Sequence, residues 1–144
     1  MKMMLRVKKM YQEEVVKEID STKEKIWSIW TDVENWNQWI GIESSKLEGN
    51  FENGAKGSSK AINGPSSSFT IEDVVENEFF ICRIKLPLCT VDGGHEMKEE
   101  NGKIKVKLYI KAYGPLLFVF KGMIKKESKG ITKAIEKLAE LAIE

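Results

Sequence analysis

All four tryptophans of the 144-residue chain lie in one stretch, Ser21-Thr-Lys-Glu-Lys-Ile-Trp-Ser-Ile-Trp-Thr-Asp-Val-Glu-Asn-Trp-Asn-Gln-Trp39. Tryptophan has the largest apolar area of any side chain, and its single N–H group needs a partner when it is buried. Because the four residues fall between Trp27 and Trp39, they fix one end of the hydrophobic core.

Two short helices are predicted within this stretch. Ser21 and Glu24 have the spacing of a capping box, in which each side chain bonds a free backbone N–H of the first helical turn. The apolar residues that follow at helical spacing are Ile26, Ile29, Trp30 and Val33. Asp32 is placed to cap a second short helix, with Trp36 and Trp39 on one of its faces.

Strands are predicted on both sides of the tryptophan stretch. The expected segments are 11–19, two weak strands within 42–62, and then 69–75, 78–86 and 103–113. The last of them, Lys103-Ile-Lys-Val-Lys-Leu-Tyr-Ile-Lys-Ala-Tyr113, alternates strictly, so one of its faces is apolar and the other carries lysines. Asn63-Gly64 is typical of a hairpin turn.

A single long helix is predicted at the C-terminal end. Pro115 suits its first turn, and no proline follows up to Ile143. At ~1.5 Å per residue the helix would be roughly 40 Å long. Its apolar stripe consists of Phe120, Met123, Ile124, Ile131, Ile135, Leu138 and Ala142. Gly122 and Gly130 lie inside it and indicate a bend or a gate.

Composition excludes several classes of function. Lys and Arg number 23 and Asp and Glu 22, so the net charge of +1 favours neither nucleic acid nor an acidic membrane surface as a partner. No apolar run is long enough to span a membrane and no secretory leader is recognisable, so we expect a cytoplasmic protein with reduced thiols. Cys82, Cys89 and a single histidine lack metal-ligand spacing, so neither a metal nor a cofactor is expected.

Turn positions predict the strand register. If Asn101-Gly102 is a two-residue turn, His95 lies opposite Leu108 and Met97 opposite Val106. The same treatment of Glu76-Asn77 pairs Ile71 with Cys82 and Phe69 with Ile84. A shift of one residue would turn every apolar side chain of a strand outward, so the face on which each residue lies is well specified.

The order of elements and several local strings resemble the START-like superfamily, also called SRPBCC or helix-grip proteins. This superfamily includes polyketide cyclases, the birch-pollen allergen, steroid-transfer domains and coenzyme Q-binding proteins. The strings that carry the resemblance are Ile19-Asp20-Ser21, Ile26-Trp27, Asp32-Val-Glu-Asn-Trp36-Asn-Gln-Trp39, Leu47-Glu-Gly-Asn-Phe51 followed by Gly54, and Tyr113-Gly114-Pro115.

The resemblance implies one α+β domain over residues 1–144. A curved antiparallel sheet of six to seven strands would wrap around the long C-terminal helix, with two short helices after the first strand. It also implies a cavity between the concave sheet face and that helix. The candidate ligand-binding residues are Trp39, Phe69, Ile71, Cys82, Ile84, His95, Met97, Leu108, Ile110, Phe120, Met123 and Ile124.

His95, the only histidine, is turned toward the interior by the predicted register. One interpretation makes it a hydrogen-bonding anchor or proton donor in an apolar pocket. The other makes it a core histidine satisfied by a backbone carbonyl or a water. In either case burial lowers its pKa unless a carboxylate lies close. Asp73 is expected at a solvated rim, while Tyr109, Tyr113 and the lysines of 103–111 are expected on the surface.

The leading hypothesis is a protein that binds one small, mostly apolar molecule of lipid, polyketide or isoprenoid type, as a carrier or sensor. The first alternative is a polyketide cyclase or dehydrase-type enzyme, in which one polar group moves a proton. The second is a protein-interaction module, which an apolar outer sheet face would favour. The sequence shows no nucleophile triad, phosphate loop or pair of inward carboxylates for other chemistry.

Overall fold

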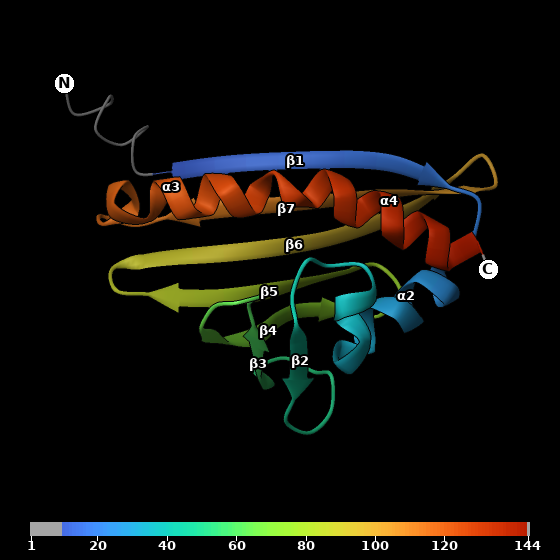
Figure 1. Cartoon of the computed structure of the whole chain (residues 1–144). Coiled ribbons are helices and arrows are strands. Elements are labelled where there is room, and N and C mark those ends of the chain that lie inside the picture. Colours follow the sequence, from blue (N-terminus) through green and yellow to red (C-terminus); the bar gives the residue numbers. More distant parts are fainter. Residues whose placement is uncertain (1–9, 144) are drawn as a thin grey trace.

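Seven antiparallel strands form one curved sheet in the order β1-β7-β6-β5-β4-β3-β2 (Figure 1). The computed structural model describes residues 10–143. The strands are β1 (Met10–Ile19), β2 (Ser44–Leu47), β3 (Lys56–Lys60), β4 (Ser66–Val75), β5 (Phe79–Leu86), β6 (Cys89–Glu100) and β7 (Lys103–Tyr113). The helices are α2 (Lys23–Thr31), the 3-10 helix η1 (Val33–Gln38), α3 (Leu117–Ser128) and α4 (Gly130–Ile143). None of the helices in this part of the chain has the length and hydropathy needed to cross a membrane.

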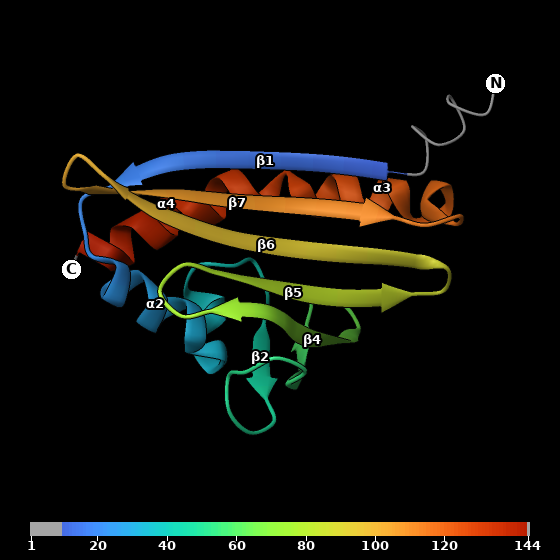
Figure 2. The ribbon, with the colours of Figure 1, turned by 180° about the vertical axis from the view of Figure 1, so that it is seen from behind.

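All the helices lie on one side of the sheet. Helices α3 and α4 follow β1 and β7, while α2 and η1 cover the end of the sheet at which β1 finishes (Figure 1). Seen from behind, the other face of the sheet has no helix in front of it (Figure 2). The sheet therefore has a concave face that grips the helices and a convex face that no described helix covers.

The register of β6 with β7 is confirmed. His95 lies opposite Leu108, Met97 opposite Val106, and Glu100 opposite Lys103. Asn101 and Gly102 both have positive φ, 52° and 78°, which a two-residue hairpin of type I′ requires. The turn chemistry thus fixed which residues of these strands face the core.

The register of β4 with β5 is confirmed at Ile71 and Cys82, although the predicted turn is wrong. Val75 pairs with Phe79, so the turn holds three residues, 76–78. A bulge between Glu72 and Val75, where Asp73 has a φ of 52°, absorbs the extra residue. Two irregularities therefore cancel, and Ile71 still faces the core. Asp73 is exposed, as expected of a rim carboxylate.

Both predicted helix caps differ in detail. Thr22, not Ser21, caps α2, and its hydroxyl accepts from the Lys25 N–H at 3.1 Å. The Ser21 hydroxyl instead donates to the carbonyl of Ala142 at 2.8 Å and so fastens the end of α4 to the start of α2. Asp32 precedes η1 as predicted, but its carboxylate accepts from the side-chain amide of Asn35 rather than from a backbone N–H.

The long C-terminal helix is confirmed, but it is built from two segments that meet at Lys129. The Ser128 hydroxyl donates to the carbonyl of Lys125 at 2.9 Å and is also bonded to the hydroxyl of Tyr11 at 2.9 Å. A serine that bonds back to the preceding turn competes with the helical ladder and often bends a helix. Gly130 begins α4 without a positive φ, so the interruption needs no left-handed residue.

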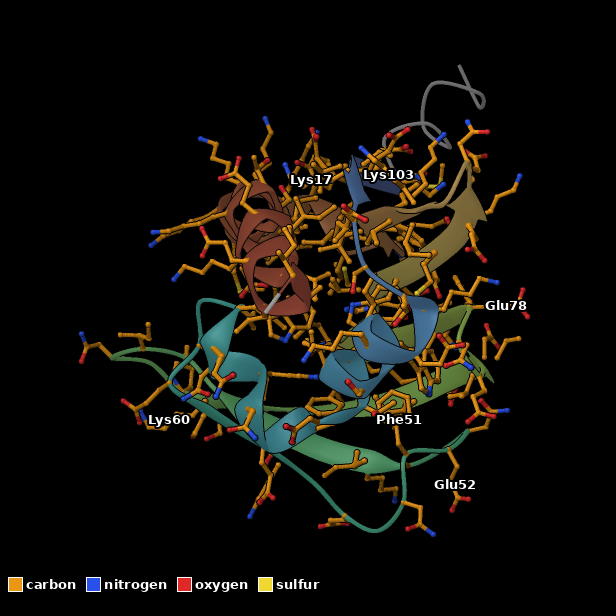
Figure 3. All side chains as sticks on the ribbon, turned by 90° about the vertical axis from the view of Figure 1, so that its right-hand side faces the viewer. Lys17, Phe51, Glu52, Lys60, Glu78 and Lys103 are labelled. Atoms are coloured by element: carbon orange, nitrogen blue, oxygen red, sulfur yellow. The ribbon has the colours of Figure 1, made fainter. Side chains whose placement is uncertain are left out.

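The core has two parts. We call the first the aromatic cluster; it consists of Trp27, Trp30, Trp36, Trp39, Phe51, Phe69 and Phe80 around His95. Figure 3 looks onto this end, where Phe51 lies by the short helices and Lys60 and Lys17 point outward. We call the second the aliphatic cluster; it consists of Cys89, Val91, Ala112, Leu117 and Ile124. The tryptophan stretch thus forms one end of the core, as predicted.

Candidate functional site

Between the two clusters, part of the concave sheet face is neither fully buried nor fully exposed. Cys82, Gly93 and Ile110 lie side by side on β5, β6 and β7. All three are half-buried, and so is Ile84, the next inward residue of β5. We call these four residues the central strip. Apolar side chains in the middle of a sheet are normally covered completely, so this strip is where core packing is incomplete.

The thiol of Cys82 shows how deep the central strip lies. Burial raises the pKa of Cys82 to about 12, with a smaller contribution from the negative charge of Asp92. Part of the residue nevertheless remains in contact with solvent. The thiol is therefore largely shielded from water although the residue is not fully buried.

Gly93 leaves room above the strip. A methyl group at this position would meet the nearest atom, the carbonyl oxygen of Cys82, at 3.6 Å, an ordinary contact distance. At the neighbouring Gly94, whose open side is on the convex face, a methyl group would overlap the ring of Tyr109. The two adjacent glycines therefore have different purposes. The absence of a side chain at Gly94 makes room for the ring of Tyr109. At Gly93 it leaves the concave face of β6 without a side chain.

His95 lies at the end of the strip nearest the tryptophans, and only 8% of its surface is exposed. Its Nδ1 donates to the carbonyl of Gly93 at 3.2 Å. The ring of Phe80 stacks on the imidazole, with ring centres 4.0 Å apart and an angle of 12° between the planes. Burial lowers the pKa of His95 to about 3, against a smaller opposing effect of the carbonyls of Gly93 and Phe80. The imidazole is thus neutral at physiological pH.

Two tryptophans beside His95 have unsatisfied N–H groups. The rings of Trp30 and Trp39 lie edge to face against the imidazole, with ring centres 5.5 and 6.1 Å away. Both indole nitrogens are buried, and neither has a hydrogen-bond acceptor among the described residues. Trp36, by contrast, donates to the carbonyl of Trp30 at 2.9 Å. A buried donor without a partner costs about 1–3 kcal/mol, so an acceptor brought here gains that energy.

Helix α3 borders the strip incompletely. Leu117 and Ile124 are fully buried in the aliphatic cluster, and Phe120 is partly buried beside them. Met123 is 46% exposed and Val119 57% exposed. Helical spacing puts these last two on the flank of α3 opposite Lys125, which faces β1. Helix α3 therefore leaves apolar side chains exposed on this flank.

The candidate residues chosen from the sequence fall into four groups in the structure. The buried core around the aromatic cluster contains Trp39, Phe69, Ile71, Met97 and Leu108, with His95 among its rings. The central strip contains Cys82, Ile84 and Ile110. The aliphatic cluster holds Ile124 and borders Phe120. Met123 is exposed and is not packed into either cluster.

Sequence reasoning missed Gly93 and Trp30. A pair of glycines inside a strand marks a bulge or a close approach, so Gly93-Gly94 carried a usable signal. Trp30 was assigned only to the core, because no sequence pattern tells which buried indole will lack an acceptor.

Two hollows lie elsewhere on the described residues. One, of about 450 Å³, is on the convex face over β2 to β5, and the other, of about 310 Å³, lies between β1 and the junction of α3 and α4. Neither is the closed cavity predicted between the concave face and the last helix. The aromatic rings occupy one end of that region, and the partly buried residues of the central strip lie beside them.

The convex face carries a group of polar residues around Arg83. Arg83 pairs with Asp92 at 2.8 Å and with Glu72 at 3.5 Å, and this hydrogen-bonded contact with Asp92 raises the pKa of Arg83. The hydroxyl of Tyr113 also donates to Asp92. Within residues 10–143, no three His, Cys, Asp or Glu side chains are grouped as metal ligands would be.

Comparisons with known proteins agree on the fold. The chain aligns with truncated norcoclaurine synthase from Thalictrum flavum at a TM-score of 0.71 and 9% identity, covering 94% of each chain. It aligns with Ara h 8.0201 at a TM-score of 0.64 and 21% identity, covering 90% of this chain and 97% of that one. The chain has the helix-grip fold of START-like proteins.

A third helix-grip structure is a two-domain protein. The di-domain aromatase/cyclase StfQ of the steffimycin biosynthetic pathway aligns at a TM-score of 0.71 and 11% identity, over 98% of this chain and 52% of StfQ. No protein-family model and no curated protein matches the sequence. The resemblance predicted from the sequence is therefore confirmed at the level of the fold.

Proposed function

We propose that this protein binds one small, mostly apolar molecule on the concave face of its sheet, over the central strip and beside α3. The observation that carries the proposal is the incomplete cover of Cys82, Ile84 and Ile110 in the middle of the sheet. Burying apolar surface releases roughly 25 cal/mol per Å², so a molecule that covers the strip is stabilised there. The helix-grip proteins that the chain resembles support this choice of face.

The inner end of the site suits a neutral hydrogen-bond acceptor. Trp30 and Trp39 offer unsatisfied N–H groups, and His95 is uncharged. An ionised carboxylate would enter this aromatic surrounding without a counter-charge, which is costly. A ketone, ester or hydroxyl oxygen has no such penalty. A mostly hydrocarbon molecule with one such oxygen, as in a lipid, polyketide or isoprenoid, therefore fits the site.

Binding has more support than catalysis. A proton-transfer group works best when its pKa lies near the working pH, and the pKa of about 3 puts His95 far below that range. Arg83, Tyr109 and Tyr113 lie on the convex face, away from the strip. Tyr11 does face the helices, but its hydroxyl is bonded to that of Ser128 at the junction of α3 and α4. A carrier or sensor in the cytoplasm, where Cys82 and Cys89 stay reduced, is the role we propose.

Gly93→Leu tests the site directly. The added side chain should fill the space above the strip without reaching the cores at either end. Binding of the neutral apolar dye Nile red, followed by its fluorescence, should weaken at least about tenfold, as expected when a ligand must compete with a side chain for the same space. Gly41→Leu is the matched control, because Gly41 has open space around it. Equal binding by both variants would overturn the proposal.

Native mass spectrometry of the freshly purified protein addresses the ligand itself. A retained molecule should be mainly hydrocarbon, carry a neutral oxygen and be missing from the Gly93→Leu protein. A charged or strongly polar bound molecule that is still retained by the Gly93→Leu protein would contradict the assignment.

A further inference from the structure

The convex face has a basic hollow that the proposed function does not use. The hollow is lined by two rows of residues that lie opposite one another on neighbouring strands. Lys46, Ser58 and Ser68 lie side by side on β2, β3 and β4, and Lys56, Thr70 and Arg83 lie side by side on β3, β4 and β5. Lys85 follows two residues after Arg83 and therefore faces the same side. These residues line the hollow of about 450 Å³.

The floor of this hollow is small and polar. Ser58, Ser68 and Thr70 have short side chains, and none of their hydroxyls has a hydrogen-bond partner within the part of the chain that the structure describes. The long lysine side chains stand around them on neighbouring strands. A floor of free hydroxyl donors inside a ring of cations is suited to a group with several oxygen acceptors.

Three lysines outside this hollow are paired with carboxylates, whereas the lysines that line it are not, among the residues that the structure describes. Lys107 pairs with Glu96 at 3.0 Å, Lys98 with Glu100 at 3.6 Å, and Lys60 with Glu43 at 3.1 Å. Within residues 10–143, neither Lys46, Lys56 nor Lys85 is paired with a carboxylate. Glu48 is the only carboxylate among the lining residues.

Arg83 is held in place rather than free. Asp92 accepts from its Nε at 2.8 Å and from a terminal nitrogen at 3.2 Å, while Glu72 lies 3.5 Å from the other terminal nitrogen. These two carboxylates fix one wall of the hollow, and together they outweigh the single positive charge of Arg83. The positive charge of the hollow therefore comes from its three lysines, Lys46, Lys56 and Lys85.

We propose that this hollow is a binding site for a small phosphorylated molecule. A phosphate group offers two negative charges and several acceptor oxygens, which match the three unpaired lysines and the three free hydroxyls. The volume of about 450 Å³ suits a small molecule. The site lies on the opposite side of the sheet from the central strip, so the two proposals are independent.

Backbone amide NMR, with inorganic pyrophosphate and glycerol 3-phosphate titrated separately at low salt, tests this site. Saturable shifts should centre on residues of β3, β4 and β5. Lys56→Gln and Lys85→Gln should each weaken binding about tenfold, the usual effect of losing one charged hydrogen bond. Lys137→Gln, an exposed residue of α4, removes the same charge elsewhere and should leave affinity unchanged. All three residues are exposed, so the variants should fold normally.

Saturation by glycerol 3-phosphate would identify an organic phosphate site, and saturation by pyrophosphate alone an inorganic one. Shifts that do not saturate with either compound would overturn the proposal. So would an equal loss of affinity in Lys56→Gln and Lys137→Gln, because it would reveal only general attraction between a cationic surface and an anion. Nile red binding should be the same in all these variants.

Discussion

The two ends of the concave face are packed in different ways. At one end the centre of the aromatic cluster is closed, and Trp30 and Phe80 have no exposed surface. At the other, α3 buries Leu117 and Ile124 while Phe118 remains 73% exposed. The aromatic end fixes the fold, and the α3 end leaves apolar surface uncovered. The difference teaches that the tightly packed part of the core and the site proposed for binding are separate parts of one concave face.

The largest expected effect comes from removing an aromatic ring at the closed end. Phe80→Ala should lower the free energy of unfolding by about 3–5 kcal/mol, because it leaves a cavity among rigid rings. Phe118→Ala, at the open end, should change it by less than about 0.5 kcal/mol. Urea denaturation of both variants checks the contrast. Similar losses would mean that the two ends contribute alike.

The adjacent glycines of β6 give the next largest difference. Gly94→Ala should destabilise the protein by about 1–3 kcal/mol, because its methyl group would displace the ring of Tyr109. Gly93→Ala should be nearly neutral, since the added methyl meets only ordinary contacts. Thermal unfolding of the two variants measures this. A large loss at Gly93 would mean that the central strip is already filled.

The pH dependence of stability isolates His95, the only histidine. Burial puts its pKa near 3 in the folded protein, against about 6.5 when unfolded, so the unfolded chain binds more protons between these values. Stability is fully present above pH 6.5 and falls as the pH drops, by on the order of 1 kcal/mol per unit. Urea unfolding at pH 7 and pH 4.5 should show a smaller fall in His95→Phe. An unchanged slope would place the imidazole in water.

The smallest expected effect concerns the junction of α3 and α4. Gly130 has no positive φ and open space around it, so Gly130→Ala should raise stability by at most about 1 kcal/mol. If α3 moves about this junction to admit a ligand, the same change should slow the association of Nile red in stopped-flow measurements. Equal association rates would exclude gating at Gly130 and leave α3 a fixed wall.

The predictions that succeeded from the sequence rest on local rules. The strict alternation over 103–113 gave β7 its bounds, and Asn101-Gly102 fixed its pairing with β6, so His95 was placed inside from turn chemistry alone. The bulge at Asp73 and the longer turn at 76–78 escaped prediction, because a bulge needs only one residue in an unusual conformation. The two irregularities cancelled, so Ile71 was still assigned correctly.

The site was predicted less well than the fold. Cys82, Ile84 and Ile110 were placed on the concave face, but their partial exposure depends on how far α3 reaches over them. Met123 belongs to the apolar stripe by its spacing, yet it is exposed, because α3 turns Leu117 and Ile124 to the sheet instead. Ser21 was given a capping role that Thr22 performs, since the sequence does not show that Ala142 lies beside Ser21.

The sequence by itself determined the order of elements, which strand residues face the core, and which segment forms one end of the core. Periodicity, turn residues and the concentration of tryptophans carry this information because they act over short distances along the chain. Only the tertiary structure decided which buried groups lack partners, which apolar positions remain open and which lysines are unpaired. These properties depend on residues that are distant in the chain and neighbours in space. Trp39 reaches His95, and Lys46 and Lys85 come to line one hollow, only when the whole sheet has formed.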